Sequence, residues 1–259
     1  MLIKNIPKVL VASPVFDGME YCIEKFLSRI KSLSYDNYDV FLVDNSEGRD
    51  FSKKLEKDYG MNVLYLDLNG ILGMKKIIRS RNRIFSYATQ NNYDYVLMMD
   101  CDVIPPADIL ERLLVHEKDV VSGLYFSLQN IDRKQEIKSV AWKFLSEDEW
   151  EEVKGQLISD VVKKREDIRR NLTEEEIDSG KLQEVIIPSC GCMLVSRDVF
   201  SRFKYGLLDV PGKINTGDDI YFCRKVREAG IKLYCDVSVR CQHLTEGKFG
   251  EDGIHPLHL

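Results

Sequence analysis

The sequence lacks long apolar segments and any excess of basic residues. No uninterrupted apolar stretch in its 259 residues approaches the roughly 20 residues that span a bilayer, so no transmembrane helix is predicted. Residues 1–7 lack the apolar core of a secretory signal peptide. The net charge of −5 argues against a general nucleic-acid binder. These absences favour a cytoplasmic protein with no nucleic-acid partner.

Cysteines are few and scattered along the chain. Seven are present, and none belongs to the C-x-x-C pattern of a zinc site. The closest pair, Cys190-Gly191-Cys192, is separated by one residue and does not match that pattern. We therefore expect reduced thiols that pack as small apolar side chains.

Apolar and amphipathic segments alternate along the first half of the chain. The apolar runs predict strands at 8–13, 40–43, 62–66 and 95–99, with Pro14 ending the first. The amphipathic runs predict helices at 18–33, 50–59 and 73–91. Strand–helix alternation with short connections predicts an α/β fold, in which a mostly parallel central sheet has helices on both faces.

The second half of the chain is less regular. It predicts strands at 119–123, 137–145, 184–188, 191–195, 231–235 and 237–241, and helices at 107–115, 197–204 and 218–229. Between residues 146 and 180 charge is dense, which predicts a charged helical insertion or surface flap. Within it, residues 171–176 have the pattern of a capped helix start. Residues 244–259 are rich in Gly, His and Pro and predict a loop-like tail.

Two carboxylates directly follow the fourth predicted strand. The apolar run Tyr95–Met99 ends in Asp100-Cys101-Asp102, and alternate residues of an extended segment point the same way. Asp100 and Asp102 are therefore expected to converge just beyond the strand, where open α/β sheets bind ligands. Two oxygen ligands there favour Mg²⁺ or Mn²⁺ carrying a substrate phosphate. A polar turn that caps a buried strand is the alternative interpretation.

Polar groups also close other predicted strands. They are Ser13-Pro14-Val15, Asp44 and His243. We expect them at the same sheet edge as the paired carboxylates, which together predict a nucleotide-type site. Imidazole is a common metal ligand, so His243 is a candidate third ligand beside Asp102. A histidine with a purely structural role is the alternative.

A second acidic pair and several arginines complete the set of candidates. Asp218 and Asp219 open a predicted helix, where acidic residues are favoured by the helix dipole in any protein. In a cleft, one of them would be suited to act as a general base. Arg79 and Arg81 lie on the helix before the paired carboxylates, and guanidinium groups bind phosphates well. Arg79 shares a helix face with Arg83, and a solvated basic face is the alternative interpretation.

Taken together, these segments resemble the GT-A fold glycosyltransferases, particularly their large family-two-like group. The matching segments are Val11–Val15, Val43–Ser46, Arg79–Asn82, Met99–Asp102, Gly191–Arg197, Gly217–Asp219 and His243. They follow the family's order over about residues 8–243. The resemblance implies one GT-A-like domain over 1–259, with a nucleotide-sugar-binding half at 8–123, an acceptor-binding half at 124–243 that includes the insertion at 146–180, and a C-terminal tail at 244–259.

The resemblance also implies which residues bind the donor. They are Ser13, Pro14, Val15, Asp44, Arg79, Arg81, Asp100 and Gly191. Asp44 would contact the nucleotide base, Arg81 the ribose or diphosphate side, and Gly191 would leave room for a sugar. Asp102, with Asp100 and His243, would bind Mn²⁺ or Mg²⁺, which makes Asp100-x-Asp102 a DXD motif.

The implied reaction is the transfer of a sugar from a UDP- or GDP-linked donor to an acceptor hydroxyl by inverting direct displacement. Asp219 matches the catalytic base, with Asp218 before it. Because the family commonly has Glu-Asp at these positions, the choice between Asp218 and Asp219 stays open, and in a retaining enzyme the pair would position substrates instead. The acceptor is a glycan, a lipid or a protein, and a lipid would require peripheral contact with a membrane.

Two other functions are compatible with this architecture. A sugar nucleotidyltransferase would resemble its family in a glycine-rich, arginine-containing loop after the first strand. Residues 13–18 contain one Gly and no Arg, which disfavours that function. The other is a nucleotide-sugar-binding protein without turnover, which the presence of Asp102, Asp219 and His243 disfavours.

Overall fold

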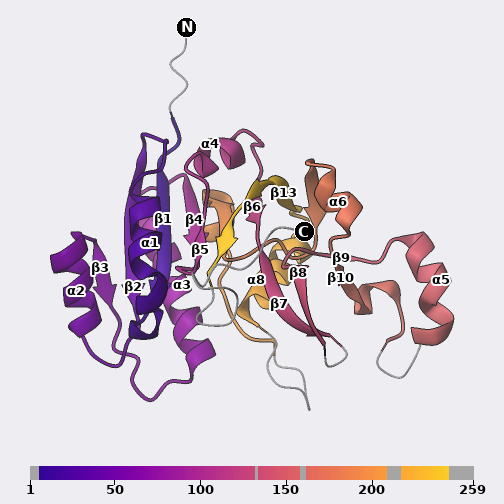
Figure 1. Ribbon diagram of the computed structural model, residues 1–259, viewed down its shortest axis with the longest axis horizontal. Coiled ribbons are helices and arrows are strands. Elements are labelled where there is room, and N and C mark those ends of the chain that lie inside the picture. Colours follow the sequence, from indigo (N-terminus) through magenta and orange to yellow (C-terminus); the bar gives the residue numbers. More distant parts are fainter. Residues whose placement is uncertain (1–5, 132–133, 158–161, 209–216, 245–259) are drawn as a thin grey trace, which may run out of the picture.

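The centre of the molecule is a mostly parallel sheet (Figure 1). The computed structural model describes residues 6–131, 134–157, 162–208 and 217–244. Within these ranges the sheet has eight strands, in the spatial order β11 (Leu182–Val185), β13 (Leu233–Arg240), β6 (Val120–Leu124), β12 (Cys192–Ser196), β4 (Tyr95–Met99), β1 (Val9–Val15), β2 (Tyr38–Asp44) and β3 (Val63–Tyr65). β12 runs antiparallel to both of its neighbours and β11 is antiparallel to β13, while the other neighbours are parallel.

Helices cover both faces of this sheet. One face carries α1 (Glu20–Ile30), which follows the short η1 (Asp17–Met19), together with α2 (Asp50–Tyr59) and α4 (Ile109–Leu114). The other carries α3 (Gly73–Gln90), α7 (Arg197–Phe200) and α8 (Asp218–Glu228). Along β1, Val9 and Val11 pack with the first group, and Leu10 and Ala12 with the second, as strand alternation requires. The predicted α/β fold class is confirmed.

Short two-stranded ribbons lie beside the sheet. In the described part of the chain they pair β7 (Phe126–Ile131) with β8 (Lys134–Ser139), β9 (Trp142–Phe144) with β10 (Arg169–Asn171), and β5 (Val103–Ile104) with β14 (Gln242–His243). The last ribbon sets His243 opposite Val103, the residue after Asp102. A contact between residues far apart in the sequence thus brings the histidine to the end of β4.

Some element boundaries differ from those predicted. Pro14 does not end the first strand, because β1 continues to Val15 and Pro14 stands opposite Val43. The pairing of β1 with β4 stops at Ala12, so the proline lies where the strand has one paired neighbour, a position that tolerates the missing N–H. The strand predicted at 137–145 is divided between β8 and β9, and the pieces at 231–235 and 237–241 are joined in β13.

The charged insertion contains a strand as well as helices. α5 (Glu147–Leu157), η2 (Arg165–Asp167) and α6 (Glu174–Asp178) lie within it, and β10 pairs with β9. α6 begins as predicted, because the hydroxyl of Thr173 accepts from the backbone N–H of Glu176 while the Glu176 carboxylate accepts from the backbone N–H of Thr173. In Figure 1, α5 lies at the opposite end of the molecule from α2 and β3.

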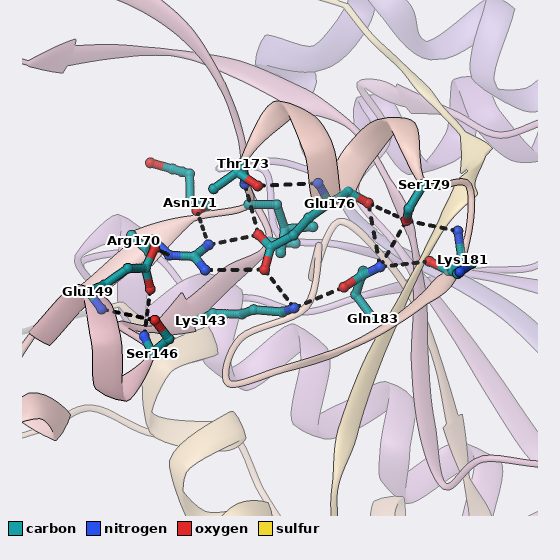
Figure 2. Close-up of polar contacts among 12 residues, drawn as sticks. Lys143, Ser146, Glu149, Arg170, Asn171, Thr173, Glu176, Ser179, Lys181 and Gln183 are labelled. Carbon is teal, nitrogen blue, oxygen red and sulfur yellow. Dashed lines mark hydrogen bonds and ion pairs between the residues drawn. The ribbon is translucent and has the colours of Figure 1, made fainter.

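Glu176 also fixes the insertion to the rest of the chain. Figure 2 shows its carboxylate between Arg170 of β10 and Lys143 of β9, with Arg170 Nη1 at 2.7 Å and Lys143 Nζ at 2.9 Å. Burial opposes ionisation, but hydrogen bonds from these two cations outweigh it and lower the pKa of Glu176 to about 2. The half-buried carboxylate is therefore ionised and joins α6 to the β9–β10 ribbon.

The described ranges contain no helix that combines the length and the apolar character needed to cross a bilayer. All seven cysteines fall inside these ranges, and each is buried and free of a disulfide. The predicted tail, apart from Leu244, lies outside the described residues.

Candidate functional site

Strand direction brings several of the predicted site residues to one edge of the sheet. β1, β2 and β4 run the same way, so Val15, Asp44 and Asp100 fall at the same side. β12 is antiparallel to β4, with Cys192 opposite Met99, so its start reaches that edge. There the backbone N–H of Asp100 donates to the carbonyl of Gly191 at 2.9 Å.

A buried arginine joins three of the predicted carboxylates. Arg81 of α3 is 4% exposed, and its Nη2 donates to Asp100 Oδ1 at 2.8 Å. Nη1 donates to Asp218 Oδ2 at 2.9 Å and also to the carboxylate of Asp219. Arg81 thus connects the end of β4 to the start of α8. We call Arg81, Asp100, Asp218 and Asp219 the carboxylate centre.

Charge crowding shifts the pKa values in the carboxylate centre. Burial by itself would lower the pKa of Arg81, but attraction from the three carboxylates outweighs it and raises that pKa. Burial, with repulsion from Asp218 and Asp100, raises the pKa of Asp219 to about 7 against the opposing effect of Arg81. One cation therefore does not compensate three carboxylates.

The two acidic residues of α8 differ in access to solvent. The side chain of Asp218 is 7% exposed, whereas that of Asp219 is 34% exposed. Asp219 thus presents its carboxylate both to Arg81 and to the outside.

Asp102 lies next to His243, as the sequence predicts. The distance from Asp102 Oδ2 to His243 Nε2 is 3.5 Å. His243 Nδ1 lies 3.0 Å from the carbonyl oxygen of Phe126, so Nδ1 carries a proton and donates it. Burial disfavours the imidazolium form, but Asp102 outweighs burial and raises the pKa of His243. Because Nδ1 is bonded to the backbone, Nε2 is the ring nitrogen that faces the Asp102 carboxylate.

These residues fit a divalent metal that is completed by substrate. The described ranges contain no group of three or more His, Cys, Asp and Glu residues arranged to hold a metal ion. Asp102 and His243 still supply two adjacent donors, and a backbone bond to Nδ1 is the usual way to orient a ligating Nε2. Asp100, the third predicted ligand, is bonded through Oδ1 to Arg81. The other positions around an ion held there would be open to water or to oxygen atoms of a substrate.

Gly191 makes room for neighbouring protein groups. A Cβ atom at this position would lie 2.7 Å from Tyr125 Oη and 2.8 Å from Asp100 Oδ2. The backbone N–H of Gly191 also donates to Tyr125 Oη at 3.3 Å. The absence of a side chain therefore allows Tyr125 and Asp100 to approach each other, and a role toward a sugar stays a prediction.

Asp44 is fully buried at the end of β2. Its Oδ1 accepts from the backbone N–H of Ser46 at 2.9 Å and from the Ser46 hydroxyl at 2.6 Å, and its Oδ2 accepts from the hydroxyl of Ser52. These bonds hold the turn between β2 and α2. Its predicted contact with a nucleotide base stays a prediction.

The other predicted donor residues differ in exposure. Ser13 and Val15 are fully buried, and Pro14 is half-buried between them at the end of β1. Arg79 is exposed on α3, two residues before the buried Arg81. Of the two arginines predicted to bind the donor, only Arg81 belongs to the carboxylate centre.

Comparison with known proteins supplies the family. The model for glycosyl transferase family 2 matches residues 11–203, well over half of the chain. The chain belongs to glycosyl transferase family 2. The family-two-like resemblance predicted from the sequence is therefore confirmed. A search of curated proteins gives no sequence match.

A solved structure confirms the fold of this family 2 chain. The mannosyltransferase PcManGT from Pyrobaculum calidifontis, in complex with GDP-Man and Mn²⁺, is similar with a TM-score of 0.52 and 15% sequence identity. The similarity covers 92% of this chain and 57% of that chain, so the chain spans somewhat more than half the length of that protein. The predicted GT-A fold is confirmed.

Two aromatic residues at the family 2 site were not predicted. Tyr125, which follows β6, packs its ring edge-on against His243 with the centroids 5.3 Å apart. The ring centroid of Tyr205 lies 5.2 Å from the guanidinium carbon of Arg81. Burial raises the pKa of both hydroxyls, so both are neutral. Tyr125 follows a strand, the signal that identified other candidates, whereas the sequence around Tyr205 has no such signal.

Proposed function

We propose that this family 2 chain is a metal-dependent glycosyltransferase that moves a sugar from a UDP- or GDP-linked donor to an acceptor hydroxyl, with inversion by direct displacement. One observation carries the proposal. A partly exposed carboxylate with a pKa of about 7, Asp219, is joined through Arg81 to Asp100 at the sheet edge where nucleotides bind. Family membership supports sugar transfer, and the structural neighbour that binds GDP-Man and Mn²⁺ supports the donor class.

Asp219 is the proposed general base. A base works best when its pKa lies near the working pH, and burial brings the pKa of Asp219 to about 7. Its carboxylate would take the proton of the acceptor hydroxyl as that oxygen attacks the anomeric carbon and the bond to the nucleoside diphosphate breaks. Asp218 is nearly inaccessible and bonded to Arg81. We assign it the role of positioning Arg81.

Arg81 and the metal-binding pair would act on the donor side. Arg81 fixes Asp100 and Asp219 relative to each other, which sets the distance between donor and base. Asp102 and His243 would hold the divalent ion, which when bound neutralises the charge of the leaving diphosphate. Ser13, Pro14, Val15, Asp44 and Arg79 keep their proposed places on the nucleotide side, and Gly191 its place beside the sugar.

A donor-turnover assay with matched variants tests this function. Release of nucleoside diphosphate from UDP- and GDP-linked sugars is followed with Mn²⁺ or EDTA, with and without glycan and lipid acceptors. We expect metal-dependent release that an acceptor accelerates, and a loss of about 10²-fold or more in Asp219→Asn. Asp198→Asn is the control, because it changes an exposed acidic residue in the first turn of α7.

Three results would contradict the proposal. Full turnover by Asp219→Asn would exclude this carboxylate as the base. Exchange of pyrophosphate into the donor would indicate a nucleotidyltransferase. Tight binding of a sugar nucleotide with no turnover under any acceptor would indicate a protein that only binds it.

A further inference from the structure

A groove lined by arginines runs along α8, the helix that begins with Asp218 and Asp219, and the proposed function does not use it. Its volume is about 600 Å³, within the usual range for small-molecule sites. We call it the arginine groove and define it by Phe144, Arg169, Ile187, Ile220, Arg224 and Arg227. It combines an apolar floor with cations, a combination suited to a polar ligand that carries negative charge.

The β9–β10 ribbon supplies one wall of the groove. Phe144 is paired with Arg169 and Lys143 with Arg170, and directly paired residues of an antiparallel ribbon lie on the same face. Lys143 and Arg170 face the Glu176 network of Figure 2. Phe144 and Arg169, one residue away on each strand, therefore lie on the opposite face, which is the groove.

Helix α8 supplies the other wall and leads to the proposed base. Ile220, Arg224 and Arg227 follow the i, i+4, i+7 spacing of one helix face. Ile220 comes directly after Asp219. Arg227 lies eight residues beyond Asp219, which is about 12 Å along the helix axis at 1.5 Å per residue. The groove-lining face of α8 thus starts one residue after the proposed base and extends over a length that suits a small ligand.

A second segment also connects the groove to the carboxylate centre. Ile187 of the groove wall is bridged to Trp142 of β9, with the Trp142 N–H donating to the Ile187 carbonyl at 2.8 Å. Four residues later the same segment reaches Gly191, whose carbonyl accepts from the N–H of Asp100. Two separate stretches of backbone therefore run from the groove lining to the carboxylate centre.

The acidic residues that line the groove, Glu166, Asp167 and Glu228, already have partners. Glu166 pairs with Arg165, Asp167 accepts the backbone N–H groups of Lys163 and Lys164, and Glu228 pairs with Arg224 and Lys225. Glu228 also attracts Arg227, but none of the three carboxylates forms an ion pair with Arg169 or Arg227.

Two arginines of the groove contact aromatic rings and form no ion pair in the described part of the chain. The guanidinium carbon of Arg169 lies 4.0 Å from the ring centroid of Trp142, and that of Arg227 lies 4.8 Å from the ring centroid of Phe144. No carboxylate of these ranges forms an ion pair with either. Burial lowers the pKa of both guanidinium groups, and in Arg227 this effect exceeds an opposing attraction from Glu228.

We propose that the arginine groove binds the acceptor through an oxyanion, a phosphate or carboxylate that the acceptor carries, held by Arg169 and Arg227. Guanidinium groups bind such oxyanions through paired hydrogen bonds. Phe144, Ile187 and Ile220 would cover the apolar faces of the same ligand, and its hydroxyl would extend past Ile220 toward Asp219. The identity of the ligand as the acceptor rests on the proposed function, whereas oxyanion binding by the groove does not.

Calorimetric titration with three probes tests the groove. Inorganic phosphate, glucuronate and neutral glucose are titrated into the full chain, into Arg169→Gln/Arg227→Gln and into Lys57→Gln, all saturated with GDP and Mn²⁺ to occupy the nucleotide edge. We expect the wild type to bind at least one oxyanion and not glucose. The double variant should bind that oxyanion at least about 10-fold more weakly. Lys57→Gln removes an exposed positive charge from α2, outside the groove, and should bind as the wild type does.

The comparison of phosphate with glucuronate identifies which oxyanion the acceptor carries. Equal affinity of the double variant and the wild type, or no oxyanion binding by the wild type, would overturn the proposal. Arg169→Lys/Arg227→Lys retains both charges and should bind the oxyanion more tightly than the glutamine variant does. Equal affinity of the lysine and glutamine variants would also overturn the proposal. This lysine pair carries the test if the glutamine variant does not fold.

Donor turnover measured in parallel separates this proposal from the proposed function. If the wild type shows no metal-dependent release from any sugar nucleotide while oxyanion binding depends on the two arginines, the groove stands and the glycosyltransferase function fails. If release is normal while oxyanion binding ignores the arginines, only the groove proposal fails.

Discussion

Replacing the central arginine tests the carboxylate centre most severely. In Arg81→Met the guanidinium is lost while Asp100, Asp218 and Asp219 remain. Arg81 is 4% exposed and Asp218 7%, so their pair is buried, and removing one partner of a buried pair costs about 3–5 kcal/mol. Asp100 and Asp219 are about a third exposed, so each of their pairs adds only about 0–1 kcal/mol. The expected loss of unfolding free energy is dominated by Asp218.

The loss should depend on pH in a defined direction. Arg81 opposes the rise in the pKa of Asp219, so its removal raises that pKa above about 7. Protonation of the carboxylates then relieves their repulsion, and the difference from the wild type should shrink as the pH falls below 7. The folded form of the variant should therefore be least stable, relative to the wild type, in alkaline buffer.

Denaturant unfolding and calorimetry measure both effects. A loss of about 3–5 kcal/mol corresponds to a fall in Tm of roughly 6–20 °C in a chain of this size. Arg83→Met changes an exposed arginine of the same helix and should lie within about 0.5 kcal/mol of the wild type. A loss below about 1 kcal/mol in Arg81→Met, or one that does not shrink in acid, would refute the reasoning.

Three further predictions concern the base, the glycine and the insertion. The value of kcat/KM should rise with pH through about 7, because Asp219 must be ionised to accept a proton and its pKa is about 7 beside Arg81, Asp218 and Asp100. A flat profile between about pH 6 and 8 would contradict this. Gly191→Ala should lower the free energy of unfolding by about 1–3 kcal/mol in denaturant, because its Cβ would lie 2.7 Å from Tyr125 Oη and 2.8 Å from Asp100 Oδ2. Unchanged stability would show that these two side chains move aside freely. Glu176→Gln should destabilise the chain by about 1–3 kcal/mol at pH 7. Since the pKa of Glu176 falls from 4.5 to about 2 on folding, this difference should be complete above pH 4.5 and vanish as the pH falls through 2, and a pH-independent difference would contradict it.

Strand ends were the most productive sequence signal. They identify Asp100 and Asp102, because alternation along β4 and the direction of parallel strands are both fixed by local pattern. They also identify His243. Its proximity to Asp102 depends on the β5–β14 ribbon, whose two-residue strands are too short to be predicted from the sequence pattern. The sequence thus predicts the sheet edge, while the ribbon that completes it is a tertiary contact.

The carboxylate centre was only partly predictable. Helical spacing separates Arg81 from Arg79 and Arg83 but does not say which face is buried. That Arg81 faces inward and meets Asp218 follows from the packing of α3 and α8 on the same side of the sheet, a contact over 137 residues of sequence. The arginine groove also depends on contacts between residues far apart in the sequence, because its walls come from β10 and α8. Its residues are ordinary surface arginines when read from the sequence alone.

One measurement tests the central claim directly: calorimetric titration of GDP and UDP into the chain with Mn²⁺ or with EDTA, for the wild type and Asp102→Asn. Asp102 and His243 supply only two donors, so ion and nucleotide should bind together. The account predicts that one nucleotide binds only when Mn²⁺ is present, and that Asp102→Asn loses this binding by about 10-fold or more. Binding that is the same in EDTA, or unchanged in the variant, would contradict it.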